Sequence, residues 1–103
     1  MVLEINSLKQ LEEKIKEYPN AIVDFYATWC GPCKAIAPKI HKLAEDNKKI
    51  GFFKVDVDQA EDLAAHFKIE AMPTFIVFKG GKQHQTIVGA NIGKIEAAVK
   101  ELH

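Results

Sequence analysis

The chain has 103 residues, of which 48% are hydrophobic and 27% charged, values typical of one globular domain with its own core. Fourteen lysines balance fourteen acidic residues, and arginine is absent. The chain therefore has no net charge to attract nucleic acid or an anionic membrane, and it lacks the usual donor to guanine and phosphate. We expect a single domain over residues 1–103 that binds no nucleic acid.

No apolar segment approaches the roughly 18 residues of a membrane span. Residues 1–5 lack the basic start and long apolar core of a signal peptide, so we expect no membrane association. The only two cysteines are Cys30 and Cys33. Few cysteines and no signal sequence favour a reducing compartment, with the cytoplasm as the default. A chain already trimmed of a targeting segment would look the same.

The first half of the chain predicts strands alternating with helices. Residues 2–5 form a short strand, and Ser7 with Gln10 opens a helix as a capping box. Residues 21–27 are apolar on both faces except at Asp24, which is typical of a central strand covered on both sides. A helix follows the cysteines.

The helix after the cysteines carries an apolar stripe, and Pro38 interrupts it, removes one backbone hydrogen bond and kinks it. Residues 52–57 predict the next buried strand. Asp58 and Glu61 then form a second capping box that opens a short helix.

The last third predicts a hairpin and a final helix. Residues 74–78 form a strand, Gly80-Gly81 marks a turn, and residues 82–88 return antiparallel. Asn91 caps the last helix. The order is β-α-β-α-β-α-β-β-α, and it predicts an α/β fold with a mixed sheet, because helices between the early strands imply parallel crossovers.

Cys30 and Cys33 lie where the second predicted strand leads into a helix. Residues three positions apart on a helix lie on one face, with Cβ atoms roughly 5–6 Å apart, which is close enough for a disulfide. Pro32 favours the first helical turn. Cys30 then sits at or next to the N-cap, where unpaired amides and the helix dipole favour the thiolate.

We interpret this pair as a reversible dithiol/disulfide site. Cys30, which we expect to be the more exposed, attacks a substrate sulfur, and the deeper Cys33 resolves the mixed disulfide. Half of a zinc site is the alternative, but a structural site needs four ligands and the four histidines form no tight pair. Lys34 excludes c-type haem attachment, which requires a histidine there. We therefore expect no metal, and we expect all four histidines at the surface: His41, His66, His84 and His103.

Asp24 is the one charged residue in an otherwise apolar strand. A buried carboxyl group has a raised pKa and exchanges its proton near neutral pH. Six residues upstream of Cys30, it could lie behind the helix start and deprotonate Cys33 during resolution. The alternative is an ordinary, half-exposed strand acid.

The element order, with Trp29-Cys30-Gly31-Pro32-Cys33 at the second strand-to-helix junction, resembles the thioredoxin family. The likeness covers essentially the whole chain and looks closest to the small cytosolic thioredoxins of eukaryotes. Besides the cysteine motif, it rests on residues 24–28, 54–58, 72–75, 78–81 and 88–90. It implies the thioredoxin fold, a five-stranded mixed sheet flanked by four helices, and the reduction of protein disulfides.

The resemblance also implies roles for residues far from the cysteines in sequence. Lys54 resembles the family's lysine partner of the buried acid; alternatively, it is a surface lysine. Only about 5–6% of X–Pro bonds are cis, so the sequence alone predicts a trans bond before Pro73. The family instead keeps a cis proline opposite the dithiol, where it would block metal access and turn the Met72 backbone toward an extended substrate.

Three further residues have two interpretations each. Trp29 is either a core residue or a rim residue whose indole N–H needs a partner. Gly89 and Ala90 form either a plain turn or, as in the family, part of the apolar rim where substrate docks. The predicted substrate-binding residues are Trp29, Gly31, Pro32, Met72, Pro73, Gly89 and Ala90.

For partners, the resemblance implies no bound cofactor and electrons from NADPH through a flavin-containing thioredoxin reductase. Substrates would be disulfide-containing proteins such as peroxiredoxins and reductases, and we expect a monomer. One alternative is an oxidase or isomerase domain, which Gly31-Pro32 disfavours because oxidising relatives usually carry histidine there. Another is a binding module or holdase, which would have no use for Cys33.

Overall fold

A computed structural model describes residues 2–103. These residues form nine elements in the predicted order: β1 (Leu3–Glu4), α1 (Leu8–Glu17), β2 (Ala21–Tyr26), α2 (Gly31–Asp46), β3 (Gly51–Asp56), α3 (Glu61–His66), β4 (Thr74–Lys79), β5 (Lys82–Val88) and α4 (Ile92–Glu101). The first strand is shorter than predicted. The long strands agree with the prediction to within about a residue at each end.

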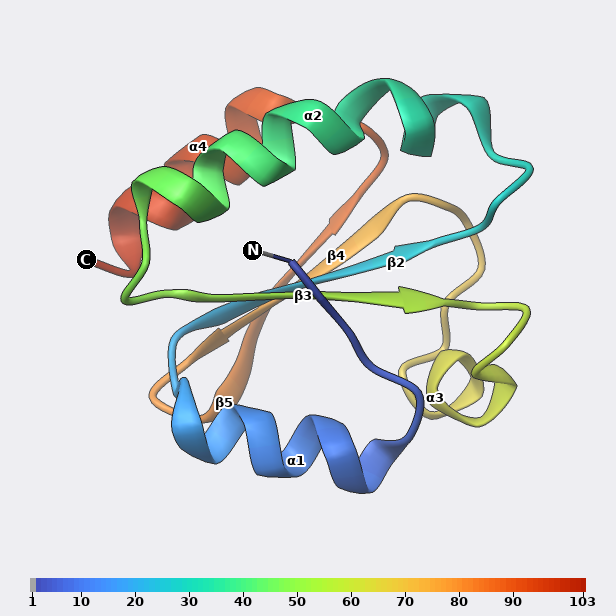
Figure 1. Cartoon of the computed structure of the whole chain (residues 1–103), viewed down its shortest axis with the longest axis horizontal. Helices are drawn as coiled ribbons and strands as arrows, with labels where there is room; N and C mark the ends of the chain where they lie inside the picture. The colour runs from blue at the N-terminus through green and yellow to red at the C-terminus, as the bar shows by residue number, and fades with distance from the viewer. Residues whose placement is uncertain (1) are drawn as a thin grey trace.

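The five strands form one mixed sheet in the order β1-β3-β2-β4-β5. The strands β1, β3 and β2 are parallel, whereas β4 runs antiparallel to β2 and β5 antiparallel to β4. This confirms the thioredoxin fold predicted from the sequence. Helices α2 and α4 cover one face, and α1 and α3 lie on the other (Figure 1), so the central strand β2 is buried on both sides.

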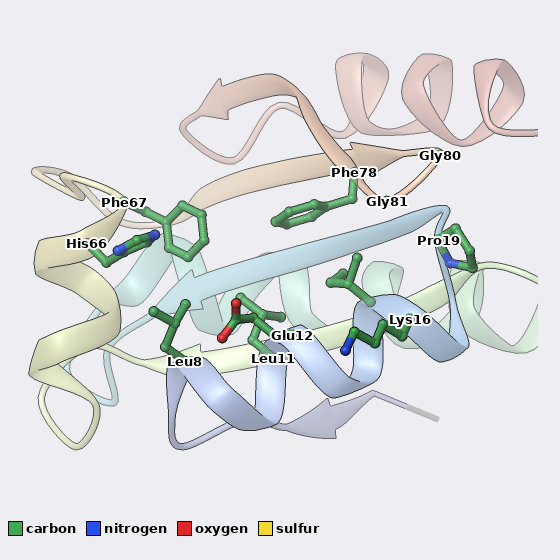
Figure 2. Close-up of a pocket in the computed structure, with 11 residues that line it drawn as sticks. Leu8, Leu11, Glu12, Lys16, Pro19, His66, Phe67, Phe78, Gly80 and Gly81 are labelled. Atoms are coloured by element: carbon green, nitrogen blue, oxygen red, sulfur yellow. The ribbon is translucent and has the colours of Figure 1, made fainter.

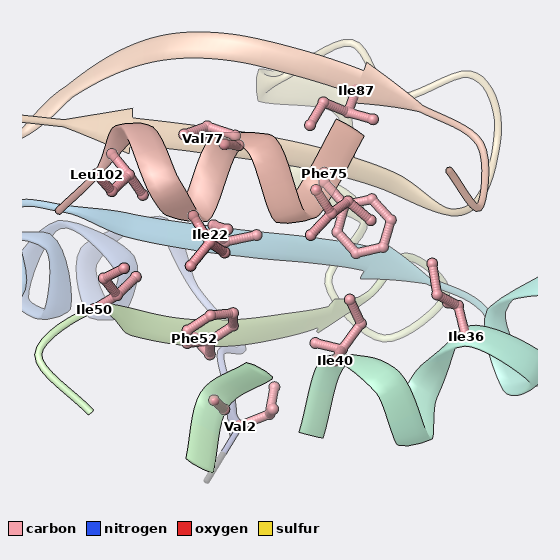
Figure 3. Close-up of a cluster of buried hydrophobic side chains, with 14 residues drawn as sticks. Val2, Ile22, Ile36, Ile40, Ile50, Phe52, Phe75, Val77, Ile87 and Leu102 are labelled. Carbon is pink, nitrogen blue, oxygen red and sulfur yellow. The ribbon is translucent and has the colours of Figure 1, made fainter. Parts of the chain in front are cut away.

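The core has one apolar layer on each face of the sheet. Between the sheet and the helices α2 and α4, Ile22, Phe52 and Phe75 pack with Ile40 and other buried residues (Figure 3). The opposite layer contains the alternate residues of the same strands, such as Phe25 and Val55, packed with α1 and α3. Two-sided burial explains why β2 reads as a nearly continuous apolar run.

Local capping signals set two of the helix starts. Ser7 accepts the N–H of Gln10 at 3.1 Å, and the Gln10 side chain accepts the N–H of Asn6 at 2.9 Å. Asn91 likewise caps α4 by accepting the N–H of Lys94. Among residues 2–103, no helix is both long enough and apolar enough to cross a membrane.

The predicted capping box at Asp58 and Glu61 is wrong. Helix α3 begins at Glu61 after Ala60, which makes no side-chain capping bond. The carboxylate of Asp58 instead accepts a hydrogen bond from Trp29, 29 residues earlier in the chain. The N–H of Asp58 is bonded to the Asp56 carboxylate, so Asp58 lies in a turn that precedes α3 and not at its N-cap.

Candidate active site

The cysteines lie at the start of α2, directly after the carboxyl end of β2. Cys30 is the N-cap of α2, and its Sγ accepts the N–H of Cys33 at 3.2 Å. Pro32 occupies the first turn, where its missing N–H leaves no bond unmade. The two sulfurs form a disulfide across a Cα–Cα distance of 5.3 Å. The expectation that both side chains point to one face is confirmed.

The prediction that Cys30 is the more exposed cysteine is wrong, because both residues are 5% exposed. The cluster of Ala27 and the two cysteines is covered by Tyr26, Val57 and Met72. The carbonyl oxygen of Met72 lies 3.7 Å from the Sγ of Cys30. What distinguishes the two cysteines is the side that each one faces. Cys30 faces the Met72 backbone, whereas Cys33 lines a partly open cavity.

That cavity, of about 260 Å³, lies between α2 and the sheet, and Asp24, Lys54 and Cys33 all line it. Asp24 is 8% exposed. Among residues 2–103, its Oδ1 is a buried side-chain oxygen without a hydrogen-bond partner. Burial raises the pKa of Asp24 from 3.8 to about 7, while the positive charge of Lys54 acts in the opposite direction. Asp24 is thus a buried acid that titrates near neutral pH, and the half-exposed alternative is wrong.

Lys54 is half-buried and stands opposite Asp24 in the register of β2 and β3. Its ammonium lies 5.8 Å from the centre of the Tyr26 ring. Lys54 and Asp24 line the same cavity, so the structure brings these two residues together, as the resemblance implied.

Trp29 lies on the surface beside Cys30, with 66% of the residue exposed. Its Nε1–H donates to Oδ2 of Asp58 at 2.9 Å, which supplies the partner that an indole needs. The core interpretation of Trp29 is therefore wrong. Gly31 and Pro32 are also exposed, at the tip of α2.

The peptide bond between Met72 and Pro73 is cis, so the resemblance predicted it correctly and the base rate did not. The carbonyl oxygen of Pro73 accepts the N–H of Gly89 at 2.8 Å. Gly89 has a φ of +95°, a conformation that favours glycine, and Ala90 after it is exposed. This hydrogen bond holds Gly89 against the Met72–Pro73 backbone, and the Met72 carbonyl of that backbone contacts Cys30.

Sequence reasoning missed two residues near the rim. Asp58 was interpreted as a helix cap, although the need of Trp29 for an acceptor was a signal that could have pointed to it. Val88 is 63% exposed and stands opposite Thr74 at the end of β5. The sequence signal for Val88 was an apolar side chain directly before Gly89, at the end of the predicted strand.

A second cavity, of about 460 Å³, lies on the other face, between α1 and the chain around Phe67 and Phe78 (Figure 2). No cysteine lines it, so the sulfur chemistry belongs to the smaller cavity. All four histidines are exposed, as predicted. Within residues 2–103, no three His, Cys, Asp or Glu side chains are grouped closely enough to hold a metal ion.

The two sulfurs can bond to each other or, once reduced, to a sulfur of another molecule, and the buried carboxyl group of Asp24 lies in the cavity that Cys33 lines. Such a centre at the end of a mixed sheet defines a thiol–disulfide oxidoreductase.

The chain belongs to the thioredoxin family, whose sequence model, Thioredoxin, matches residues 2–101. It is 42% identical to thioredoxin-1 of Schizosaccharomyces pombe over 100 residues, which are 97% of each chain. Its fold is similar to the X-ray structure of Fasciola hepatica thioredoxin, with a TM-score of 0.94, 39% identity and coverage of 99% of this chain and 100% of that one.

A third similar chain comes from a structural study of the thiol resolving mechanism in yeast mitochondrial 1-Cys peroxiredoxin via glutathione and thioredoxin systems. It has a TM-score of 0.93 and 37% identity, and the match covers 98% of this chain and 95% of that one. The protein is a thioredoxin-type disulfide reductase with Cys30 and Cys33 as its redox pair.

Proposed function

We propose that Cys30 attacks the substrate disulfide and that Cys33 resolves the intermediate. The Cys30 thiolate forms a bond to one substrate sulfur, the substrate S–S bond breaks, and the other substrate sulfur leaves as a thiolate that takes up a proton. Cys33 then loses its proton and attacks the Sγ of Cys30. The mixed disulfide breaks, the substrate departs with two thiols, and the protein retains the disulfide.

The observation that carries this division of roles is the different environment of the two sulfurs. Cys30 Sγ accepts the N–H of Cys33 at the N-cap of α2, and this amide together with the helix dipole stabilises a thiolate. Cys33 lines the cavity of Asp24, where a proton acceptor is available. The first sulfur is therefore suited to attack and the second to proton loss.

We propose Asp24 as the base that takes the proton of Cys33, with Lys54 as its charge partner. A general base works best when its pKa lies near the working pH, and burial brings the pKa of Asp24 to about 7. Lys54 limits this rise. The cavity that they share with Cys33 supports a transfer either directly or through water.

For substrate binding, we propose that an extended segment lies along the Met72–Pro73 backbone, as in a short strand addition. The contact between Cys30 Sγ and the Met72 carbonyl supports this path, because it places the attacking sulfur beside the backbone. The exposed Trp29 and the loop held to Pro73 through Gly89 would flank the segment. The proposed binding residues are Trp29, Gly31, Pro32, Met72, Pro73, Gly89 and Ala90.

We propose that a flavin-containing thioredoxin reductase returns two electrons from NADPH to the disulfide, and that the protein itself binds no cofactor. Proposed substrates are disulfide-containing proteins, including peroxiredoxins and reductases; the similar chain from the yeast peroxiredoxin study supports the first of these. We propose a cytoplasmic monomer, because a reducing compartment keeps such a pair available as thiols. Cell fractionation and light scattering test these two points.

The test is insulin-disulfide reduction with reductase and NADPH, comparing the parent protein with Cys30→Ser and Cys33→Ser. Neither variant should turn over, and a stable insulin adduct should accumulate only with Cys33→Ser. Adducts that form through Cys33 in the Cys30→Ser variant at the same rate would contradict the assigned roles. Undiminished function of Cys33→Ser in the assay would instead favour a binding module.

A further inference from the structure

Three charged residues form a row across the sheet beside the active site. In the parallel registers, Glu4 of β1 pairs with Lys54 of β3, which pairs with Asp24 of β2. Residues paired in this way project to the same face of the sheet. Lys54 therefore stands between two acidic residues in the sheet, and only one of them belongs to the proposed proton-transfer site.

Glu4 is nevertheless bonded to a third residue. Both of its carboxylate oxygens lie within hydrogen-bond distance of the Tyr26 hydroxyl, Oε2 at 2.8 Å and Oε1 at 3.1 Å. Among residues 2–103, the ion pairs within 4.0 Å include neither Glu4 with Lys54 nor Asp24 with Lys54. The neighbouring acid on β1 is thus held by a neutral donor instead of by the lysine beside it.

Tyr26 is suited to this task at every physiological pH. Burial, followed by the hydrogen bond to Glu4, raises the pKa of Tyr26, so the hydroxyl keeps its proton and remains a donor. Tyr26 lies two residues after Asp24 on β2, and hence on the same face. The Lys54 ammonium lies over the Tyr26 ring, 5.8 Å from its centre, within the range of a cation–π attraction.

We propose that the Tyr26 hydroxyl holds the Glu4 carboxylate away from Lys54 and so reserves the Lys54 ammonium for Asp24. Tyr26 and Glu4 are then positioning residues for the resolving step, an inference that rests on the proposed role of Asp24. Both residues act through Lys54, although Tyr26 also packs against the cluster of Ala27, Cys30 and Cys33.

The energetic argument is a competition for one positive charge. A Glu4 carboxylate released from Tyr26 has Lys54 as its nearest strand neighbour, and ion pairing would draw the ammonium away from Asp24. The protonated form of Asp24 would then be favoured further, because the positive charge of Lys54 would do less to offset the effect of burial on the pKa. From α2, the cavity is lined by Lys34, His41 and Cys33, and Cys33 does not titrate while it is bonded to Cys30. All three residues are unchanged by substitutions at Tyr26 and Glu4. The β3 carboxyl of Asp56 also remains.

The experiment is a titration of the Asp24 carboxyl carbon by NMR in the oxidised protein. Tyr26→Phe keeps the ring and deletes the donor, and it should raise the midpoint of Asp24 by roughly half a pH unit. Glu4→Gln should not raise it. In the double variant Glu4→Gln/Tyr26→Phe, the midpoint should equal that of Glu4→Gln, because no carboxylate is left to be released.

Tyr18→Phe is the matched control, since Tyr18 packs on the opposite face of the sheet against Phe53, and it should leave the midpoint unchanged. An unchanged midpoint in Tyr26→Phe would overturn the proposal. So would an equal rise in the Glu4→Gln background, because the hydroxyl would then act on Asp24 without Glu4.

This titration involves no turnover, so it separates the positioning role from the proposed function. The pH profile of mixed-disulfide resolution should move to higher pH with the Asp24 midpoint in Tyr26→Phe. If Asp24→Asn resolves with the parent pH profile, the base assignment fails, whereas the response of the Asp24 midpoint to Tyr26 and Glu4 still stands.

Discussion

Asp24 and Lys54 stand opposite each other in the register of β2 and β3 and line one cavity with Cys33, yet no ion pair within 4.0 Å joins them among residues 2–103. The acid is buried, and its Oδ1 has no hydrogen-bond partner among the same residues. A buried carboxylate without close partners costs folding free energy. The structure keeps a destabilising group at the place where the proposed reaction needs a base.

The first prediction concerns the stability of Asp24→Asn. The folded protein holds the Asp24 proton more tightly than the unfolded chain, with the pKa raised from 3.8 to about 7. As the pH rises from about 4 to about 7, the unfolded chain therefore loses this proton first, and the folded state loses stability. Above this range, Asp24→Asn should be more stable than the parent by up to about 4 kcal/mol.

Urea unfolding of the two oxidised proteins at pH 4 and pH 8 measures this effect. The gain should be large at pH 8 and small at pH 4, because at the lower pH the carboxyl is mostly protonated in the folded state. A gain of the same size at both pH values would show that the effect of the asparagine is unrelated to the charge.

The second prediction concerns the kinetics of resolution. Asp24→Asn should slow the attack of Cys33 on the mixed disulfide by roughly 10²-fold, the lower end of the usual contribution of a general base. It should also remove the rise in rate near pH 7 that the titration of Asp24 produces. Lys54→Met should instead move this rise to higher pH, because Lys54 lowers the pKa of Asp24. Single-turnover mixing with a disulfide peptide measures the rate.

The internal control is the first chemical step. In a Cys33→Ser background, where only the attack by Cys30 occurs, Asp24→Asn should leave the rate of adduct formation unchanged. If adduct formation slows by the same factor, Asp24 acts on both sulfurs and the assignment of a resolving base is wrong.

The sequence predicted most of the fold because its signals were local. Ser7 and Asn91 cap helices through amides three residues away. The nearly continuous apolar run of β2 predicted a strand that is covered on both faces. Asp58 is not a cap because α3 begins only at Glu61, after Ala60, and the Asp58 carboxylate instead binds Trp29, 29 residues away. Nothing in the composition of residues 58–61 indicates that bond.

The sequence predicted which residues form the site, but it did not predict all of the contacts between them. The spacing of Cys30 and Cys33 predicted the disulfide, whereas their burial involves Val57 and Met72, which pack against their cluster from distant parts of the chain. The cis bond before Pro73 was reached only through resemblance. The bond between Glu4 and Tyr26 spans 22 residues and depends on β1 lying beside β3, which no local pattern encodes.

The third prediction uses Trp29, the only tryptophan, as its own reporter. Asp58→Ala removes the acceptor of the indole N–H, so the fluorescence of Trp29 should change and the KM for a protein disulfide should rise as the rim loses its fixed side chain. Stability should fall by less than about 1 kcal/mol, since the bond is exposed. Asp62→Ala, an exposed acid on α3, is the control and should change neither the fluorescence of Trp29 nor the KM. Unchanged fluorescence in Asp58→Ala would contradict the hydrogen bond.

The last prediction concerns Gly89, whose φ of +95° is unfavourable for a residue with a Cβ atom. A Cβ added there would meet no atom within 4 Å, so the cost of Gly89→Ala is conformational, about 1–2 kcal/mol. Because the Gly89 N–H is bonded to the Pro73 carbonyl, relaxation of the loop should also disturb the Met72–Pro73 backbone, along which we propose that substrate binds. This should lower kcat/KM. Gly93→Ala in α4 is the control: its Cβ would lie 3.5 Å from Asn91, an ordinary contact, and alanine favours a helix. Thermal unfolding should show a loss for Gly89→Ala and none for Gly93→Ala, and equal effects of the two substitutions would refute the conformational argument.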